Sequence, residues 1–281
     1  MMVHLDGSLV PEEQAKVPVS DRGLLYGDGV FETMRVCGGR VFRLEAHLAR
    51  LRDGLRVLGI ELERNDEELS GAVGETLEAN GLRDAAVRVT VTRGSGGTRL
   101  DTEACAAATV LVRATAFGGY PEELYERGLS AITVKGAVNR DSPLCGVKSL
   151  NRLEHILARR AAREAGVDEA LLADGEGLVI EAAASNVFVV KGDTVYTPPV
   201  EAGALPGITR ACVLEALAEG GVEVIEAGLT LADGGAKGFE EAFLTNSLMG
   251  VMALRRVDGV EVGRGVPGPV TASVRGAYAV L

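Results

Sequence analysis

The sequence lacks the cysteine and histidine patterns that would define a simple functional class. Its cysteines form no Cys-x-x-Cys pair, and the three histidines, His4, His47 and His155, stand far apart. Such spacing is not typical of a disulfide framework or a zinc site. The cysteines are therefore expected to be small buried residues of a reduced compartment rather than catalytic thiols. They are Cys37, Cys105, Cys145 and Cys212.

Long apolar runs are also missing. No stretch approaches the roughly 18 uninterrupted apolar residues that a membrane-spanning helix needs, and the first residues lack the basic and apolar regions of a signal peptide. The 29 basic and 40 acidic residues give a net charge of −11, which repels nucleic-acid phosphates and anionic lipid surfaces. We expect a cytoplasmic protein that binds neither nucleic acid nor a membrane.

The length of 281 residues, with 47% hydrophobic and 25% charged residues, is typical of a soluble chain with two lobes or one large core. A break at Gly118-Gly119-Tyr-Pro121 predicts two domains, residues 1–118 and residues 119–281. The many glycines, 37 in all, suit tight turns between strands. The fold class expected from these patterns is α+β, that is, mixed α/β.

Local patterns predict both helices and strands. Asp6-Gly7 and Gly38-Gly39 are typical of hairpin turns. Apolar residues at helical spacing predict helices over 44–58, 66–80, 149–165 and 208–219. Valines alternating with polar residues over 87–92 predict a half-buried strand. Four short apolar runs between 169 and 197 are expected to form a meander.

Common catalytic motifs are absent. Gly94–Gly97 lacks the third glycine of a dinucleotide-binding fingerprint, and Gly146–Ser149 lacks the preceding glycine of a phosphate-binding loop. Neither a His-Glu-x-x-His motif nor a Gly-x-Ser-x-Gly motif occurs. This leaves Lys148, between a turn and a predicted helix, and Glu181, at the end of an apolar strand. A desolvated lysine can bond covalently to a carbonyl cofactor, but spacing alone fits a surface lysine and a strand-end carboxylate better.

Six short sequence motifs favour a functional role for Lys148 and Glu181, because all six occur together and in one order. They are SDRGLLYGDGVFET at 20–33, HLARL at 47–51, GVKSLN at 146–151, DEALL at 168–172, EAAASNVF at 181–188 and LPGITR at 205–210. In this the chain resembles the class IV aminotransferase family, the fold-type IV enzymes of pyridoxal 5′-phosphate, from about residue 3 to residue 257. The resemblance implies a small N-terminal α/β lobe, a larger C-terminal barrel-like lobe and a homodimer.

The resemblance also assigns the residues that hold pyridoxal phosphate. It makes Lys148 the lysine that binds the cofactor covalently and then moves protons, and Glu181 the partner of the pyridine nitrogen. A carboxylate there keeps the ring protonated, so that the ring can accept electrons.

The resemblance also predicts the phosphate ligands, which lie in two of these motifs and in one further segment. The resemblance implies Arg50, the backbone amides of Ile208 and Thr209 at a helix start, and the hydroxyl of Ser247, which is the weaker match. A helix N-terminus suits a phosphate dianion. Without the resemblance, Arg50 would be read as a solvated helix residue, Thr209 as a helix-start hydroxyl and Ser247 as a turn residue.

The reaction is less well defined by the sequence than the cofactor. Phe31-Glu-Thr33, Arg93–Gly97 and Asn246–Gly250 resemble the branch that cuts 4-amino-4-deoxychorismate to 4-aminobenzoate and pyruvate. This points to a lyase with Phe31 and Thr33 at the substrate. The alternative is an aminotransferase for D-amino acids or branched-chain L-amino acids with 2-oxoglutarate as acceptor. The loop around Arg99 departs from the lyase pattern. Arg99 is expected to bind a substrate carboxylate or else to be an exposed loop charge.

Overall fold

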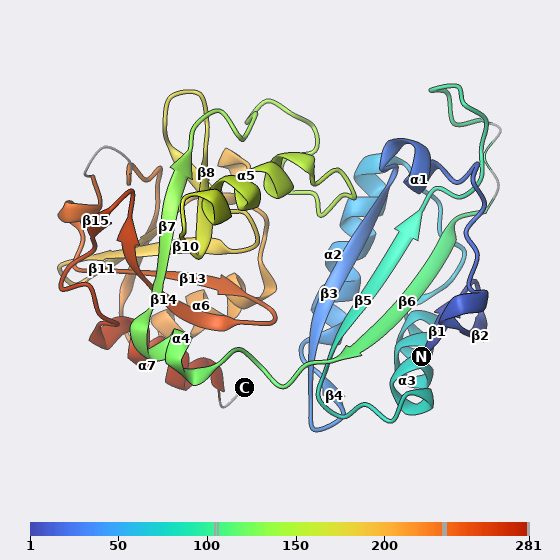
Figure 1. Cartoon of the computed structure of the whole chain (residues 1–281), viewed down its shortest axis with the longest axis horizontal. Coiled ribbons are helices and arrows are strands. Elements are labelled where there is room, and N and C mark those ends of the chain that lie inside the picture. Colours follow the sequence, from blue (N-terminus) through green and yellow to red (C-terminus); the bar gives the residue numbers. More distant parts are fainter. Residues whose placement is uncertain (104, 106, 232–234, 280–281) are drawn as a thin grey trace. The chain divides into compact units, whose positions relative to one another are not determined.

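The structure is a computed structural model that describes residues 1–103, 105, 107–231 and 235–279. The described chain forms two compact units (Figure 1). The first comprises Met1–Gly118 together with Val147–Asn151, and the second comprises Gly119–Gly146 and Arg152–Leu281. The expected second domain, 119–281, therefore has to be corrected at 147–151. That segment pairs with a strand of the first unit, through hydrogen bonds described below.

The first unit contains a six-stranded antiparallel sheet in the order β2-β1-β6-β5-β3-β4. Its strands are β1 (Met2–Leu5), β2 (Ser8–Pro11), β3 (Gly29–Cys37), β4 (Arg40–Val41), β5 (Ala85–Thr92) and β6 (Thr109–Ala116). Its helices are α1 (Arg22–Tyr26), α2 (Leu44–Leu58) and α3 (Asp66–Ala79). The apolar stripes of α2 and α3 pack on one face of this sheet, where they bury the predicted valines of β5.

Local sequence explains how these elements begin and turn. Asp6 and Gly7 both have positive φ, at 49° and 94°, which confirms the predicted tight turn between β1 and β2. At the start of α3, Asn65 and Glu68 form a reciprocal capping box between their side chains and backbone amides. Gly81 follows α3 with a φ of 63°, as expected for a residue that ends a helix.

The second unit contains a nine-stranded mixed sheet that curls into a half-barrel. Eight strands follow the order β12-β11-β10-β13-β14-β7-β8-β9, and β15 pairs with β14. The strands are β7 (Leu129–Val134), β8 (Glu169–Ala173), β9 (Val179–Ala182), β10 (Asn186–Lys191), β11 (Thr194–Thr197), β12 (Glu223–Glu226), β13 (Glu241–Asn246), β14 (Gly250–Val257) and β15 (Val260–Glu261). The helices are α4 (Glu122–Arg127), α5 (Leu153–Glu164), α6 (Ile208–Glu219) and α7 (Pro269–Ala279).

Two predictions about this region were wrong. The helix expected over 149–165 begins only at Leu153, because Lys148 and Leu150 are hydrogen-bonded to β3 and Ser149 forms a bridge with Val30. Its buried face carries Ala158 and Ala162, whereas the expected core residues Leu153 and Leu157 are exposed. The expected meander is two separate hairpins, β8-β9 and β10-β11, because β10 pairs with β13 instead of β9.

In the part of the chain that the structure describes, no helix combines the length and apolar character needed to cross a bilayer. Among the same residues, no group of three or more histidines, cysteines or carboxylates is arranged to hold a metal ion.

Candidate active site

Lys148 lies on a short extended segment at the edge of β3. The backbone amide of Phe31 donates to the carbonyl of Lys148 (3.0 Å), and the amide of Leu150 donates to the carbonyl of Gly29 (2.9 Å). Between them, Val30 and Ser149 form an antiparallel bridge. Because side chains alternate along extended backbone, Ser149 shares the helix-covered face with Val30. Lys148 is therefore directed to the opposite face of the sheet, together with Phe31.

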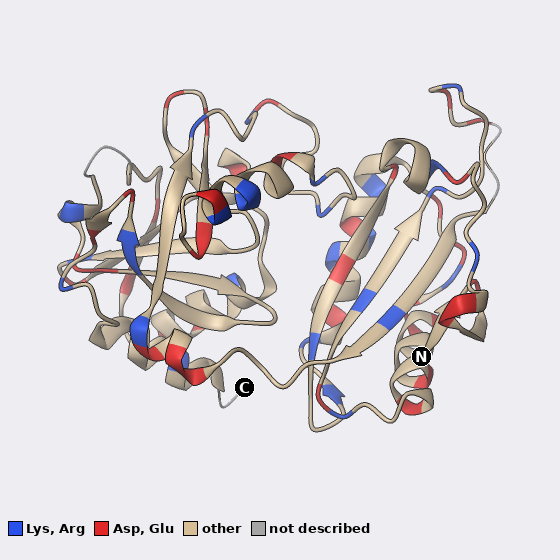
Figure 2. Cartoon of the chain, viewed as in Figure 1, with Lys and Arg blue, Asp and Glu red and all other residues tan. Residues whose placement is uncertain are grey.

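The aromatic ring of Phe31 brings two cationic side chains together on that opposite face. The Lys148 Nζ is 4.7 Å from the ring centroid, and the guanidinium carbon of Arg88 is 3.7 Å from it. Arg88 is the β5 partner of Thr33, so Thr33 lies beside it on the same face. Figure 2 shows basic residues on β5 and β6, which are Arg88 and Arg113. The structure thus places Phe31, Thr33 and Lys148 in one neighbourhood and adds Arg88 to it.

Arg50 lies on α2 and forms a bidentate ion pair with Glu32 of β3. Its Nε donates to one carboxylate oxygen (2.8 Å) and its Nη2 to the other (2.7 Å). Burial raises the pKa of Glu32, but hydrogen bonds from His47 and Arg50 outweigh burial and hold that pKa at about 2. The Arg50 side chain is only 9% exposed, so it is not one of the solvated arginines of this helix.

Glu181 of β9 is held by two contacts within the second unit. The backbone amide of Leu205 donates to its Oε2 (3.0 Å), and the Nε2 atom of His155 lies 3.4 Å from its Oε1. The Glu181 side chain is 11% exposed. Glu181 is thus an oriented, largely buried carboxylate rather than a strand-end surface charge.

The first turn of α6 presents backbone N–H donors and contains no acidic residue. Gly207 precedes the helix and provides no capping side chain, and the first turn contains no Asp or Glu. Gly207 has to be glycine, because a Cβ atom there would lie 2.0 Å from the Asn186 Oδ1. Thr209 is 1% exposed, and its hydroxyl is 3.3 Å from that of Tyr278. This helix start, at Ile208 and Thr209, suits an anion.

Ser247 lies in the turn between β13 and β14. The side-chain carbonyl of Asn246 accepts hydrogen bonds from the amides of Leu248 (3.0 Å) and Met249 (2.8 Å), which fixes this turn. The side-chain amide of Asn246 donates to the Ser185 hydroxyl (3.0 Å). Ser247 is half-buried.

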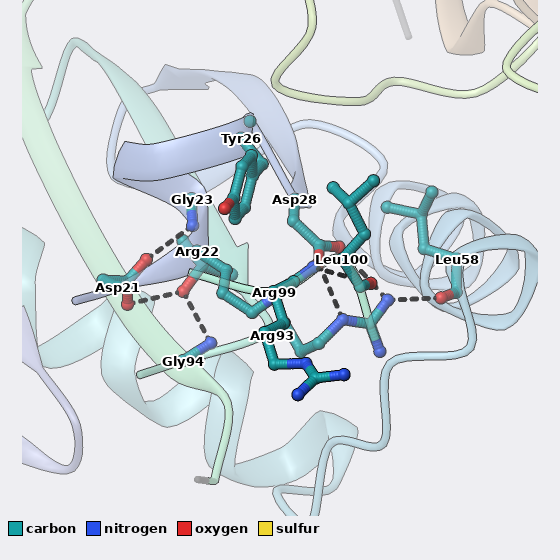
Figure 3. Close-up of polar contacts among 12 residues, drawn as sticks. Asp21, Arg22, Gly23, Tyr26, Asp28, Leu58, Arg93, Gly94, Arg99 and Leu100 are labelled. Atoms are coloured by element: carbon teal, nitrogen blue, oxygen red, sulfur yellow. Dashed lines mark hydrogen bonds and ion pairs between the residues drawn. The ribbon is translucent and has the colours of Figure 1, made fainter. Parts of the chain in front are cut away.

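Arg99 lies in a loop whose backbone is anchored while its side chain is exposed. Arg22 donates to the carbonyls of Arg99 (2.7 Å) and Leu100 (3.5 Å) and to Asp28 (2.9 Å), as Figure 3 shows. Arg93 binds the same Asp28 carboxylate. The Arg99 side chain is 86% exposed and pairs with Asp101. The described contacts of Arg99 are those of a loop charge.

The predicted site residues fall into two sets, one in each unit. The first unit holds Phe31, Thr33, Arg50, Arg99 and Lys148, and the second holds Glu181, Ile208, Thr209 and Ser247.

The sequence did not predict a role in the site for three residues of the first unit, Arg88, Glu32 and His47. Arg88 looks like an ordinary outward-facing residue of an alternating strand, so no local signal distinguished it. Glu32 and His47 lie within two of the sequence motifs, at 20–33 and 47–51. Their presence in those motifs is the one sequence feature that could have indicated a role for them.

Comparison with known proteins identifies the family. Residues 29–257 match the amino-transferase class IV family. A Methanocaldococcus jannaschii protein named provisionally as a branched-chain-amino-acid aminotransferase is 41% identical, over 98% of this chain and 94% of its own. The D-alanine aminotransferase of Bacillus licheniformis is 35% identical, over 99% and 95%. The chain therefore belongs to the class IV aminotransferases, which are pyridoxal phosphate-dependent enzymes.

Solved structures agree with this assignment. The branched-chain aminotransferase from Thermoproteus uzoniensis, solved with norvaline, superposes with a TM-score of 0.90 at 34% identity, covering 99% of this chain and 93% of that one. A Legionella pneumophila protein named provisionally as a 4-amino-4-deoxychorismate lyase gives a TM-score of 0.85 at 27% identity, covering 94% of each chain.

The side chains present fit the chemistry of pyridoxal phosphate. Lys148 carries a primary amine, Glu181 carries a largely buried carboxylate, and α6 begins without an acidic residue and with the buried hydroxyl of Thr209. Gly207, which precedes this helix, has no Cβ, and the close approach of Asn186 requires a glycine at that position. The amine, the carboxylate acceptor and the helix-start donors match, respectively, an aldehyde, a ring nitrogen that carries a proton, and a phosphate dianion.

Proposed function

We propose that this enzyme is an aminotransferase that exchanges an amino group between a branched-chain L-amino acid and 2-oxoglutarate. The observation that carries the proposal is the 41% identity, over nearly the full length of both chains, to the provisionally named branched-chain relative. The lyase reaction favoured by the short sequence motifs has weaker support, because the similar structure named as a lyase is only 27% identical to this chain. The aminotransferase alternative is therefore preferred to the lyase reading.

Lys148 and Glu181 are proposed to perform the steps that all such reactions share. When bound, pyridoxal phosphate supplies an electron-accepting ring that stabilises negative charge at the substrate carbon. The Nζ of Lys148 binds the cofactor covalently and afterwards carries the proton at that carbon. The Glu181 carboxylate, oriented by Leu205 and His155, holds the proton on the pyridine nitrogen.

The phosphate ligands are proposed to be those expected from the sequence. The amides of Ile208 and Thr209 and the Thr209 hydroxyl donate to phosphate oxygens at the positive end of the α6 dipole. Arg50 supplies a full positive charge, and Ser247 supplies a further hydroxyl. Phosphate binding to charged and backbone donors fixes the cofactor's position without taking part in proton transfer.

Phe31 and Arg88 are proposed to recognise the substrates. The Phe31 ring gives an apolar surface near the Lys148 amine, which suits an aliphatic side chain. Arg88 stacks on the same ring and presents a guanidinium fork suited to a carboxylate of the 2-oxoglutarate acceptor. We assign this carboxylate to Arg88 in preference to Arg99, whose side chain is 86% exposed.

D-Alanine transamination is the second candidate, because the Bacillus licheniformis D-alanine aminotransferase is 35% identical over 99% of this chain. The two candidates differ in the face of the substrate from which the proton is removed. They can be separated only by supplying each enantiomer to the same preparation.

One set of assays tests the proposal. Purified enzyme loaded with pyridoxal phosphate should convert L-leucine, L-isoleucine or L-valine with 2-oxoglutarate to glutamate faster than it converts D-alanine or D-glutamate. With 4-amino-4-deoxychorismate and no keto acid, 4-aminobenzoate should form slowly or not at all. Faster turnover of the D-amino acids would establish the second candidate, and rapid 4-aminobenzoate formation would overturn both aminotransferase readings.

A further inference from the structure

A carboxylate lies in the apolar core of the first unit where the strand pattern calls for a hydrophobic residue. On β3 the core-facing positions are Val30, Glu32, Met34 and Val36, and the other three belong to the buried cluster beneath α2 and α3. Glu32 itself is 0% exposed. Burying a charge is costly unless it is paired, so this residue has to be explained by what it contacts.

Both oxygens of Glu32 are committed to two residues of α2. Arg50 occupies both oxygens through Nε and Nη2, and the Nδ1 of His47 lies 2.7 Å from Oε2. A bidentate fork holds the guanidinium plane in one orientation. Because Nε and Nη2 form one edge of that plane, fixing them also fixes the direction in which Nη1 points.

His47 is arranged to fix Glu32 without adding a charge. Burial lowers the pKa of His47, and the Arg50 and Lys148 cations lower it further, against the opposing effect of Glu32. The neutral ring then has one proton, which belongs on Nδ1, since a carboxylate can only accept. Among the described residues, the buried Nε2 atom has no hydrogen-bond partner, which is less costly for a bare nitrogen than for an N–H group.

We propose that Glu32 and His47 are positioning residues for phosphate recognition: His47 fixes the Glu32 carboxylate, and Glu32 fixes the Arg50 guanidinium in the orientation that binds the cofactor phosphate. The inference rests on the proposed role of Arg50. It predicts that changes at Glu32 or His47 weaken binding of the phosphate group and leave recognition of the pyridine ring unaffected.

A purely electrostatic role for Glu32 makes the opposite prediction. If the carboxylate only offset the charge of Arg50, removing it would strengthen binding of an anion. If Glu32 only stabilised the fold, its loss would weaken phosphate-bearing and phosphate-free ligands alike. Comparing pyridoxal phosphate with pyridoxal, which differs from it by the phosphate group, therefore separates the three roles.

The experiment measures equilibrium dissociation constants of the full-length apoprotein for pyridoxal phosphate and for pyridoxal. In Glu32→Gln we expect affinity for pyridoxal phosphate to fall about tenfold or more, the size expected for a lost charge-assisted hydrogen bond, with the affinity for pyridoxal unchanged. His47→Leu should show a smaller loss of the same kind. His47→Asn, which keeps a donor near the Nδ1 position, should restore most of the parent affinity.

Further variants separate this proposal from the proposed function. Arg50→Ala should abolish the preference for pyridoxal phosphate over pyridoxal, and Glu32→Gln added to it should cause no further loss. If the parent does not bind pyridoxal phosphate, the proposed function itself fails. If Arg50→Ala loses the preference while His47→Leu and Glu32→Gln retain it, the positioning role is overturned. Should Glu32→Gln not fold, as judged by far-ultraviolet circular dichroism, the pair of His47 variants decides alone.

Discussion

The buried Glu32 carboxylate should make the stability of the first unit depend on pH in a defined direction. Burial raises its pKa, but His47 and Arg50 bring the folded-state value down to about 2 from the reference value of 4.5. A carboxyl group whose pKa is lowered by folding contributes stability that is present above its unfolded pKa and is lost as pH falls toward the folded value. The difference, 4.5 minus about 2, corresponds to about 3 kcal/mol at about 1.36 kcal/mol per pKa unit.

Glu32→Gln is the perturbation that removes this contribution. At neutral pH the variant should unfold with a free energy about 3 kcal/mol below that of the parent, and by about pH 4 the gap should narrow by about 1 kcal/mol, since the unfolded parent then binds protons. His47 has a separate window. Its folded pKa lies below 6.5, so its contribution is present above that value and is lost as pH falls below it, and His47→Asn should remove this dependence.

Urea unfolding of the apoprotein, followed by far-ultraviolet circular dichroism at several pH values, measures both windows. Circular dichroism is the suitable probe because the chain contains no tryptophan. Because Glu32 also raises the pKa of His47, the comparison is made in the His47→Asn background. A gap between His47→Asn and the Glu32→Gln/His47→Asn double variant that stays constant from pH 7 to pH 4 would refute the reasoning, because it would mean that the carboxyl group binds protons equally in both states.

Three further predictions concern the site. Lys148→Ala should bind pyridoxal phosphate without covalent attachment, so that borohydride treatment and peptide mass spectrometry find no pyridoxyl group; attachment at another lysine would move the assignment. Glu181→Gln should keep the cofactor but lose the preference for it over an analogue with carbon in place of the pyridine nitrogen, because an amide holds the ring proton less well; an unchanged ratio of dissociation constants would argue against this pairing. Arg88→Met should raise the KM for 2-oxoglutarate about tenfold or more, whereas Arg99→Met should change it little, and the reverse order would make Arg99 the carboxylate contact.

Local turn and helix signals predicted much of the fold. The Asp-Gly and Gly-Gly turns and the apolar stripes of α2 and α3 depend on neighbouring residues, so short sequence windows contain the necessary information. The prediction of a helix over 149–165 was wrong at its start, because Ser149 and Leu150 bond to β3. Pairing of Ser149 with Val30 spans more than a hundred residues of sequence, and helical periodicity carries no information about such a partner.

The same distinction separates the site residues that were anticipated from those that were not. Lys148, Arg50 and Glu181 lie in recognisable sequence motifs, and their neighbours in sequence are enough to predict the roles proposed for them. Arg88 lies in a strand whose alternation is fully explained by one buried and one polar face. Its contact with Phe31 exists only because β5 pairs with β3 in a particular register. A functional residue on the open face of a sheet looks the same in sequence as a solvated one.

This difference explains why the cofactor was easier to infer than the reaction. Covalent attachment, ring protonation and phosphate binding require fixed residue types at fixed positions, and Lys148 and Glu181 would serve a lyase and an aminotransferase equally. Choice of substrate depends instead on the side chains that surround the reacting carbon. In the first unit we propose the Phe31 ring and the Arg88 guanidinium for this role, because both lie close to one another and the ring lies close to the Lys148 amine. A lyase acting on one substrate needs no place for a second carboxylic acid, whereas an aminotransferase has to admit an aliphatic side chain and a dicarboxylate in turn. An apolar ring with a guanidinium stacked on it would meet both requirements at one position, which is a physical argument in favour of the proposed aminotransferase reaction.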